Sequence, residues 1–460
     1  MQNTKRSTFS GKIGFVLAAA GSAVGLGNIW RFPYLAAEHG GGIFLLVYLI
    51  LALTFGFALM CGEIALGRKT GKSAIEAFGA LNKKYAFVGV LAAIVPMLIL
   101  PYYSVIGGWV TKYFFVYASG QGSAAATTEN YFGDFIGSTF EPIGWFMLFL
   151  GATALIVLFG VEKGIEKVSK FLMPLLIALT IGITVYIMFL PGAMDGVKYY
   201  LLPDFSKFSE TTVLAAMGQL FYSMSLAMGI MITYGSYMKK DVSINSSVKQ
   251  IEIFDTGVAF LSGLMIIPAV FAVDPSSIGT KGGTLMFATL PHIFDGIGGV
   301  TGDIIGAAFF LLVLLAALTS SISLMETVVS IFRDKFGWSR KFTCLVVFVG
   351  CVLLGIPSSL GNGIWKSFNI AGKGILDMFD IFANNILMPI VAFITCIFIG
   401  YVIKPQTLID EIEIDGKKFK RGWLFKIMIK YIAPICIVLI LAFSLLDAFG
   451  LLETFGLTKV

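Results

Sequence analysis

One apolar segment near the start of the chain contains residues that a continuous membrane helix would avoid. Residues 21–34 include three glycines together with Asn28 and Arg31. Glycine lowers helix stability, and amide or guanidinium groups are costly at membrane depth unless they line a cavity or find partners. Interrupted backbone is tolerated inside a bilayer only where protein or a water-filled cavity surrounds it. The sequence therefore predicts a helix that stops and restarts beside a binding site.

The rest of the chain is rich in further apolar segments. Of 460 residues, 57% are hydrophobic and only 13% are charged, as in membrane proteins with many spans. We therefore expect an all-α polytopic membrane protein that forms one domain over residues 1–460 in the lipid bilayer of the plasma membrane. Windows of about 20 residues predict eleven transmembrane helices at 12–37, 42–67, 86–118, 142–160, 166–190, 212–238, 250–273, 303–331, 342–359, 376–402 and 423–447.

Basic residues gather in alternate connections between these spans. Lys83 and Lys84 follow the second span, and Arg333 and Lys335 follow the eighth. Such loops face the cytoplasm in membrane proteins, so we expect a cytoplasmic N-terminus and, after eleven spans, an outer C-terminus. The net charge of +6 is thus explained by topology, and no nucleic-acid partner is expected. With two histidines and no nucleophile–base motif, the chain is not expected to be an enzyme.

A second apolar span, around residues 219–229, also carries small and polar residues at its middle. The two interrupted helices would occupy corresponding positions in two halves of five helices each. This arrangement is typical of inverted repeats in membrane transporters, whose site lies at the shared interface. We therefore predict repeat one at about 12–190, repeat two at about 212–402, and an extra helix at about 423–447, with helices 1 and 6 unwound at mid-membrane.

Four motifs in this order resemble those of the neurotransmitter:sodium symporter family, and the resemblance covers residues 6 to 445. They are residues 21–34, 38–42, 219–229 and 318–321. The resemblance implies sodium-coupled uptake of a small solute by alternating access, with two sodium ions. A non-transporting ligand sensor of the same fold is an alternative.

The resemblance also implies ligands for both sodium ions. One site would combine the carbonyls of Gly21, Val24 and Ala316 with the hydroxyls of Thr319 and Ser320. Helix–helix hydrogen bonding is the alternative role of these two hydroxyls. The other site would use the Ala23 carbonyl, Asn28 and Ser223, together with the carboxylate of the substrate.

Asp255 departs from the pattern of many relatives, which carry Asn at this position. Animal members bind chloride nearby, with ligands that match Tyr48, Gln219 and Ser223. A fixed carboxylate beside the sodium ligands would supply that negative charge, so we hypothesise that Asp255 replaces chloride and that transport is chloride-independent. In the alternative interpretation, Asp255 is a solvated residue at a helix end.

The substrate class depends on Gly25, where amine-transporting relatives carry Asp. Because Gly25 has no side chain, the substrate must bring its own carboxylate. Backbone amides near Leu26 and Gly27, at the start of a half-helix, favour an anion, and Tyr103 would donate its hydroxyl to it. Simple packing is the alternative role of Tyr103.

The pocket for the substrate side chain is expected to be mainly apolar with a few hydroxyls. Without a charged residue, it favours a neutral L-amino acid, and an amine or an osmolyte is the alternative. Ala23 and Ser223, named above for sodium, and the residues named for the carboxylate would also line this pocket. The other lining residues would be Ser22, Ile99, Tyr222, Ser225, Ala227, Met228, Ser320, Ser323 and Leu324.

Two charged pairs are candidates for gates on either side of this pocket. Arg31 would meet Asp380 on the outer side, above Tyr103 and Tyr222. On the inner side Arg6 would meet Asp334 near Tyr237, and Phe9 stands where relatives commonly have Trp. Each pair could instead be a static surface bridge that contributes little stability.

Overall fold

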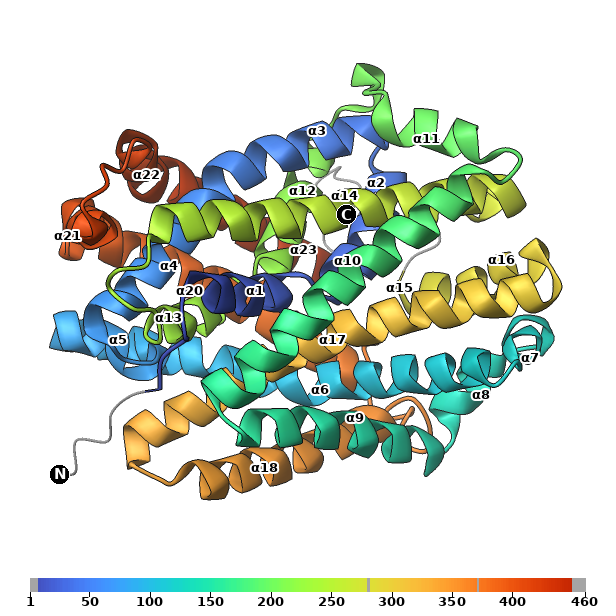
Figure 1. The fold of residues 1–460 in the computed structure, drawn as a ribbon, viewed down its shortest axis with the longest axis horizontal. Coiled ribbons are helices and arrows are strands. Elements are labelled where there is room, and N and C mark those ends of the chain that lie inside the picture. Colours follow the sequence, from blue (N-terminus) through green and yellow to red (C-terminus); the bar gives the residue numbers. More distant parts are fainter. Residues whose placement is uncertain (1–6, 279–281, 370–371, 449–460) are drawn as a thin grey trace.

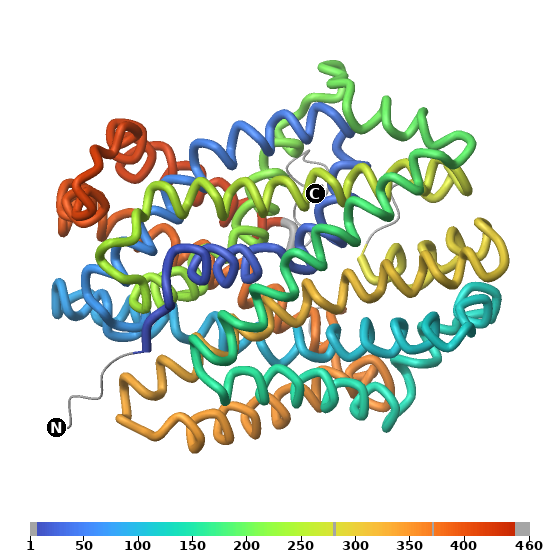
Figure 2. Tube along the Cα trace, viewed as in Figure 1, coloured from blue at the N-terminus to red at the C-terminus, as the bar shows by residue number. Residues whose placement is uncertain are grey.

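The computed structural model describes residues 7–278, 282–369 and 372–448. Within these ranges every regular element is helical, which confirms the predicted all-α fold. Figure 1 and Figure 2 show long helices that run in roughly the same direction and cross at shallow angles. The chain enters the described part at the end of the bundle that also holds α5 (Ala74–Leu81), α21 (Pro405–Ile412) and α22 (Gly422–Ile427).

Nine helices of the described part are long and apolar enough to cross a membrane, and a bent pair at the start makes ten. Their bounds agree with the predicted spans to within a few residues at most ends, but the seventh begins earlier than predicted, at Ile244, and the eighth is longer at both ends. Several contain a π-helical turn that joins two labelled α-helices. The long helices are α3 (Gly42–Leu51) with α4 (Phe57–Thr70), α6 (Ala86–Ala118), α9 (Glu141–Leu158), α10 (Lys167–Met188), α14 (Ile244–Val273), α17 (Gly299–Phe336), α18 (Arg340–Leu360), α19 (Ile375–Asp380) with α20 (Met388–Ile397), and α22 with α23 (Ala433–Ala448).

The first span is broken at the predicted place. Helix α1 (Lys12–Ala23) ends two residues before Gly25, and the chain resumes as a π-helical turn followed by α2 (Phe32–Glu38). The two pieces meet at an angle of 50°. Val24 has an extended conformation at the break, so its carbonyl leaves the helical hydrogen-bond pattern.

The predicted sixth span is also broken, into α12 (Glu210–Ser223) and α13 (Ile230–Gly235). Between them Ser225, Ala227 and Gly229 have positive φ angles of 52°, 58° and 70°. This left-handed conformation strains residues with a side chain and ends an α-helix. Because the two pieces are short, neither passes as a membrane-crossing helix by itself, which explains why fewer than the predicted eleven spans are counted.

Helix α13 lies directly against α4 through two glycines. A Cβ atom on Gly67 would overlap the carbonyl oxygen of Ile232, and one on Gly235 would overlap that of Ile64. Small residues allow membrane helices to approach to backbone contact in this way. The short inner piece of the broken sixth span is therefore closely packed against the second span.

The shorter helices connect the long ones at the two ends of the bundle. On the end away from α21 lie α7 (Gly122–Thr127), α8 (Tyr131–Gly137), α11 (Ala193–Leu201) and α16 (Leu290–Ile297), as Figure 1 shows. In the middle, α1 packs against α14 and α17, and α17 packs along α6. Both helix breaks thus face the centre of the bundle.

Candidate functional site

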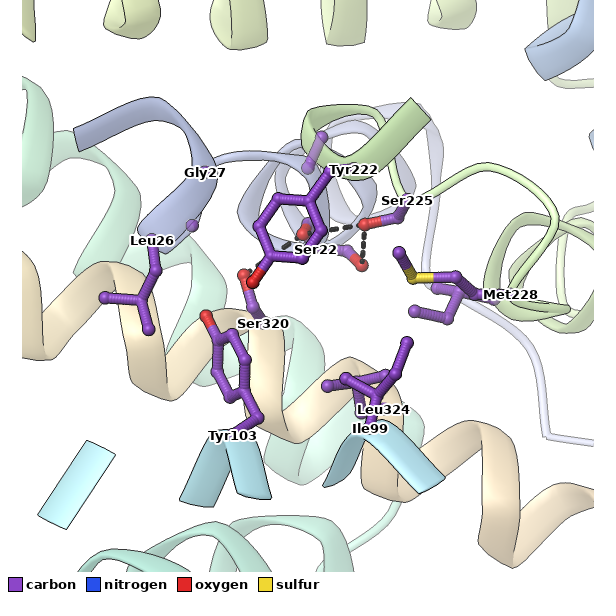
Figure 3. A pocket seen from close by; sticks show the side chains of 13 residues that line it. Ser22, Leu26, Gly27, Ile99, Tyr103, Tyr222, Ser225, Met228, Ser320 and Leu324 are labelled. Carbon is purple, nitrogen blue, oxygen red and sulfur yellow. Dashed lines mark hydrogen bonds between the residues drawn. The ribbon is translucent and has the colours of Figure 1, made fainter. Parts of the chain in front are cut away.

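A small enclosed cavity lies between the two helix breaks (Figure 3). It measures about 30 Å³, which is room for one or two water molecules, so its walls must move apart to admit a larger solute. None of the described residues that line it is charged. The lining consists of Ser22, Ala23, Gly25, Leu26, Gly27, Ile99, Tyr103, Tyr222, Ser225, Met228, Ile230, Ser320 and Leu324.

The two broken helices are joined directly at the cavity. Ser225 Oγ donates a hydrogen bond to the carbonyl of Ser22 at 3.0 Å, and the two hydroxyls are 3.3 Å apart. Ser320 Oγ, from α17, donates to the same carbonyl at 3.1 Å. Unpaired backbone groups of the first break are therefore satisfied by hydroxyls from two other helices, as buried polar groups must be.

Two hydroxyl groups, those of Ser320 and Tyr103, lie close to Gly25 in the first break. A Cβ atom there would lie 2.5 Å from Ser320 Oγ and 3.2 Å from the Tyr103 hydroxyl. That hydroxyl is buried and forms no well-aligned hydrogen bond with a described residue, although the Ser320 hydroxyl and the Leu26 amide lie close to it. The arrangement leaves a donor aimed at the backbone of the break, as Figure 3 shows for Tyr103 and Ser320.

The five predicted ligands of one sodium ion lie together. Ser320 Oγ is 3.4 Å from the carbonyl oxygen of Val24 and 3.5 Å from that of Gly21. Thr319 Oγ1 is 3.0 Å from the carbonyl of Ala316, and a Cβ on Gly21 would touch the Thr319 side chain. Carbonyl and hydroxyl oxygens from an unwound segment and a helix are a suitable set for a hard monovalent cation.

The residues predicted around the other sodium ion also converge. Asn28 Oδ1 accepts a hydrogen bond from the Gly25 amide at 3.1 Å. Its amide nitrogen donates to Asp255 Oδ1 at 2.7 Å, and Ser223 Oγ donates to the same atom at 2.7 Å. Ala23 lines the neighbouring cavity. Side chains from α12, α14 and the first break thus form one polar cluster.

Asp255 is fully buried in the middle of α14. The interpretation of Asp255 as a solvated residue at a helix end is therefore wrong, because α14 begins at Ile244, several residues earlier than predicted. Tyr48 Oη lies 3.3 Å from Asp255 Oδ2, and Gln219 Nε2 donates to the Gly27 carbonyl at 2.7 Å. Of the three residues that the sequence analysis compared with chloride ligands, Tyr48 and Ser223 therefore contact this carboxylate, and Gln219 binds the backbone of the first break instead.

Three residues predicted to line the pocket lie behind its wall. Ser223 belongs to the cluster around Asp255. The Ala227 amide donates to Glu63 Oε1 at 2.7 Å, and Ser323 Oγ accepts a hydrogen bond from Tyr234 at 2.8 Å. Each of these hydrogen bonds holds one of the broken helices, or α17 beside them, in position. The sequence analysis missed Ile230, which lines the cavity as the first residue of α13.

The predicted outer pair of charges is close but not joined. Among the described residues, Arg31 makes no ion pair within 4.0 Å, and its guanidinium lies 5.4 Å from the centre of the Tyr222 ring. Asp380 instead accepts hydrogen bonds from Tyr102 at 2.9 Å and Asn384 at 2.7 Å. The direct pair predicted from the sequence is thus not formed in this conformation. Tyr102 and Asn384 were missed, since a tyrosine and an amide in an apolar span carry no distinctive sequence signal.

On the inner side, Arg6 lies outside the described residues, so its predicted pairing with Asp334 stays a prediction. Asp334 Oδ2 accepts a hydrogen bond from the Ser73 amide at 2.8 Å. Tyr237 donates to Glu326 at 2.8 Å. Phe9 is buried against aromatic rings of the first and sixth spans, so the N-terminal segment closes the bundle below the cavity.

Comparison with known proteins agrees with this geometry. The sodium:neurotransmitter symporter family matches residues 6–131 and 136–452. An uncharacterized sodium-dependent transporter of Bacillus subtilis, YhdH, is 35% identical over 96% of this chain and 98% of its own length. The sodium- and chloride-dependent glycine transporter 2 of Xenopus laevis is 26% identical over 96% of this chain and 65% of its own.

Among solved structures, the crystal structure of MhsT in complex with L-phenylalanine has a TM-score of 0.86 and 39% identity. It covers 95% of this chain and 99% of that chain. The two chains therefore share the same overall helical fold. The chain therefore belongs to the sodium:neurotransmitter symporter family, whose members are multi-pass membrane transporters that depend on sodium and are not enzymes.

Proposed function

We propose that the protein imports a neutral L-amino acid together with sodium. The observation that carries this proposal is the buried hydroxyl of Tyr103 beside Gly25, which forms no well-aligned hydrogen bond with a described residue. A buried donor without an acceptor is costly, and a substrate carboxylate placed at the first break would accept its hydrogen bond. Because Gly25 has no side chain, no acidic group at this position would repel that carboxylate once the cavity widens to admit the substrate.

The side-chain end of the pocket supports an uncharged substrate. Ile99, Met228 and Leu324 line it, and Ser225 and Ser320 are its nearest hydroxyls. No charged partner for an acidic or basic side chain lies among the described lining residues. The structure of the related MhsT was determined in complex with L-phenylalanine, which makes a large apolar amino acid a suitable first candidate. Met228 is flexible enough to adapt to several side chains.

We further propose two sodium ions and no requirement for chloride. One ion would be held by the oxygens around Thr319 and Ser320, and the other by Asn28, Ser223 and the substrate carboxylate. The second ion couples directly to the substrate because the two share a contact. Asp255, buried next to these groups, would supply the negative charge that chloride supplies in other members of the family.

Alternating access would use the two breaks as hinges. Residues of about 12–190 and 212–402 would form two inverted repeats around the cavity, with 423–447 outside them. Arg31, Tyr222 and Asp380 would close the outer path, and the segment around Phe9 and Tyr237 the inner one. The N-terminus would lie in the cytoplasm of a cell with the protein in its plasma membrane.

The proposal is tested by thermal stability of the purified protein with each of twenty amino acids, in sodium and in potassium. A ligand that binds the folded state must raise the unfolding temperature, and we expect neutral amino acids to do so only in sodium. Stabilisation by amines or betaine-like osmolytes alone would contradict the substrate class. Accumulation of the labelled ligand against its gradient in proteoliposomes then separates a transporter from a ligand sensor of the same fold.

A further inference from the structure

A second, larger cavity lies far from the substrate site, at the end of the bundle that holds α21 and α22 (Figure 1). It measures about 460 Å³ and is open on one side. Its walls are the end of the predicted tenth span and the beginning of the last span. It is lined by Gly400, Tyr401, Lys404, Pro405, Gln406, Lys426, Ile427, Lys430 and Tyr431, which we call the basic groove.

Three lysines converge on the basic groove from two different membrane-crossing segments. Lys404 precedes α21, Lys426 belongs to α22, and Lys430 lies in the π-helical turn that follows. None of the three forms an ion pair with a described residue. The concentration of positive charge in the groove is therefore not neutralised by the part of the protein that the structure describes.

The two acidic residues that follow Lys404 in the sequence, Asp410 and Glu411, form no ion pair with the groove lysines. Asp410 accepts a hydrogen bond from Gln406 at 2.8 Å. Glu411 is buried and pairs with Arg68 at 2.8 Å and Lys240 at 2.6 Å. Asp410 is therefore held beside the groove by Gln406, which lines it, and Glu411 is paired outside it; neither carboxylate forms an ion pair with a groove lysine.

The position of Lys430 is fixed by its neighbours. Tyr401 donates its hydroxyl to the Lys430 carbonyl at 2.8 Å, and the Lys430 ammonium lies 5.7 Å from the centre of the Tyr401 ring. A Cβ on Gly400 would be 3.4 Å from Lys430 Cγ, so the lysine stem packs across the neighbouring helix. Two spans are tied together here, with a cation held between them.

An exposed apolar stripe continues from the groove along the last span. Ile427, Tyr431, Ile435 and Leu439 are spaced four residues apart, on one face of a helix. Their exposed fractions are 40%, 56%, 62% and 55%. This span is one of those long and apolar enough to cross a membrane, so the stripe would face the lipid chains.

We propose that the basic groove binds the phosphate headgroup of an anionic phospholipid whose acyl chains lie along this stripe. Basic pockets between transmembrane helices on the cytoplasmic side attract anionic headgroups, and tyrosines at the same level suit the membrane interface. Lysines that merely extend toward water would not converge on one cavity from two spans. The combination of three clustered cations and an adjoining lipid-facing stripe fits a phospholipid better than a free anion.

The test uses the full-length protein in a neutral detergent. Native mass spectrometry counts bound lipid, and thermal unfolding reports stabilisation, with phosphatidylglycerol, phosphatidylcholine or inorganic phosphate added. The variant Lys426→Gln with Lys430→Gln removes two groove charges. The matched control, Lys417→Gln with Lys418→Gln, removes two exposed charges from the same end of the protein outside the groove.

We expect one tightly held phosphatidylglycerol on the native protein and on the control. The groove variant should bind it at least about tenfold more weakly, a loss of about 1.4 kcal/mol. Replacement of both lysines by arginine should restore binding, and it keeps the experiment decisive if the glutamine variant fails to fold. Equal binding of phosphatidylcholine, equal stabilisation by inorganic phosphate, or equal loss in the control would each overturn the proposal.

Discussion

Asn28, in the first helix break, donates a hydrogen bond of 2.7 Å to the buried carboxylate of Asp255 in α14. The same amide side chain presents its oxygen to the Gly25 backbone at 3.1 Å. One residue therefore connects the backbone that would receive the substrate with the only acidic group in its polar cluster among the described residues. A change in the charge of Asp255 would therefore act, through Asn28, on the backbone conformation at Gly25.

Replacement of Asp255 by Asn should change the anion requirement of transport. The variant keeps the size of the side chain but removes its charge, so a mobile anion would be needed near Ser223 and Tyr48. We expect sodium-dependent uptake by the variant to rise several-fold when gluconate is replaced by chloride. Native uptake should be the same in both anions. As a control, Asp241→Asn changes an exposed carboxylate and should show no anion effect. A collapse of native uptake in gluconate would contradict the hypothesis.

The variant Gly25→Ala should lose substrate binding while remaining folded. Its methyl group would enter the space between Ser320 Oγ, at 2.5 Å, and the Tyr103 hydroxyl, at 3.2 Å. Because the carboxylate of the substrate needs this space, we expect the ligand-induced rise in unfolding temperature to disappear. Gly182→Ala in α10 places its methyl in open space and should leave that rise intact. If Gly25→Ala binds the substrate normally, the carboxylate lies elsewhere.

The variant Tyr103→Phe should weaken substrate affinity more than stability. The hydroxyl forms no well-aligned hydrogen bond with a described residue, so its removal should change the stability of the substrate-free protein little. A hydrogen bond to a carboxylate contributes about 1.5–3 kcal/mol, which corresponds to roughly 10- to 100-fold in affinity. Isothermal titration with the identified amino acid measures the loss. An unchanged affinity would restrict Tyr103 to a packing role.

The variant Thr319→Val should raise the sodium concentration needed for half-maximal binding. It keeps the shape of the side chain but removes an oxygen that lies 3.0 Å from the Ala316 carbonyl. We expect the sodium requirement to increase by about tenfold, or about 1.4 kcal/mol. Thr327→Val, two turns later in α17 and bonded to the Ser323 carbonyl, is the matched control. Equal effects of both substitutions would indicate a helix-packing role.

Ala227→Gly should stabilise the protein slightly. Ala227 has a φ of 58°, a conformation that costs about 1–2 kcal/mol for a residue with a side chain. Glycine removes this strain, but its greater freedom in the unfolded chain lowers the free energy of unfolding by about 0.5–1 kcal/mol, so the net gain is small. The unfolding temperature without substrate should rise. Ala154→Gly, in the regular helix α9, should lower it. A fall for both variants would show that the methyl group of Ala227 contributes packing that outweighs the strain.

The broken helices could be predicted because their residues are unfavourable in a continuous helix that crosses a membrane. Gly25 and Gly27 in an apolar segment predict an interruption, and Asn28 needs a partner that lipid cannot supply. The structure has the break at this place, from Val24 to Leu26. Ser225 was likewise predicted near the second break, although its positive φ could not be read from a serine.

The contacts between distant side chains were harder to predict. Arg31 and Asp380 have opposite charges, which suggested a direct pair. In the structure Tyr222 occupies the space beside the guanidinium, and Asp380 is satisfied by Tyr102 and Asn384. The charges of two residues do not by themselves show which hydrogen-bond donors the fold places next to a carboxylate. The alternative interpretation of Asp255 as a solvated residue at a helix end was wrong because a hydropathy window does not detect the first, polar turns of α14, which begins at Ile244.

The backbone contact of Gly67 and Gly235 with the opposite helix also has a consequence for motion. No side chain separates α4 from α13 at these points, so neither helix can slide or tilt without the other. If α13 moves during the proposed transport cycle, α4 would have to move with it as one rigid unit. Larger residues at Gly67 or Gly235 would separate α4 from α13 and should slow transport without contacting the substrate.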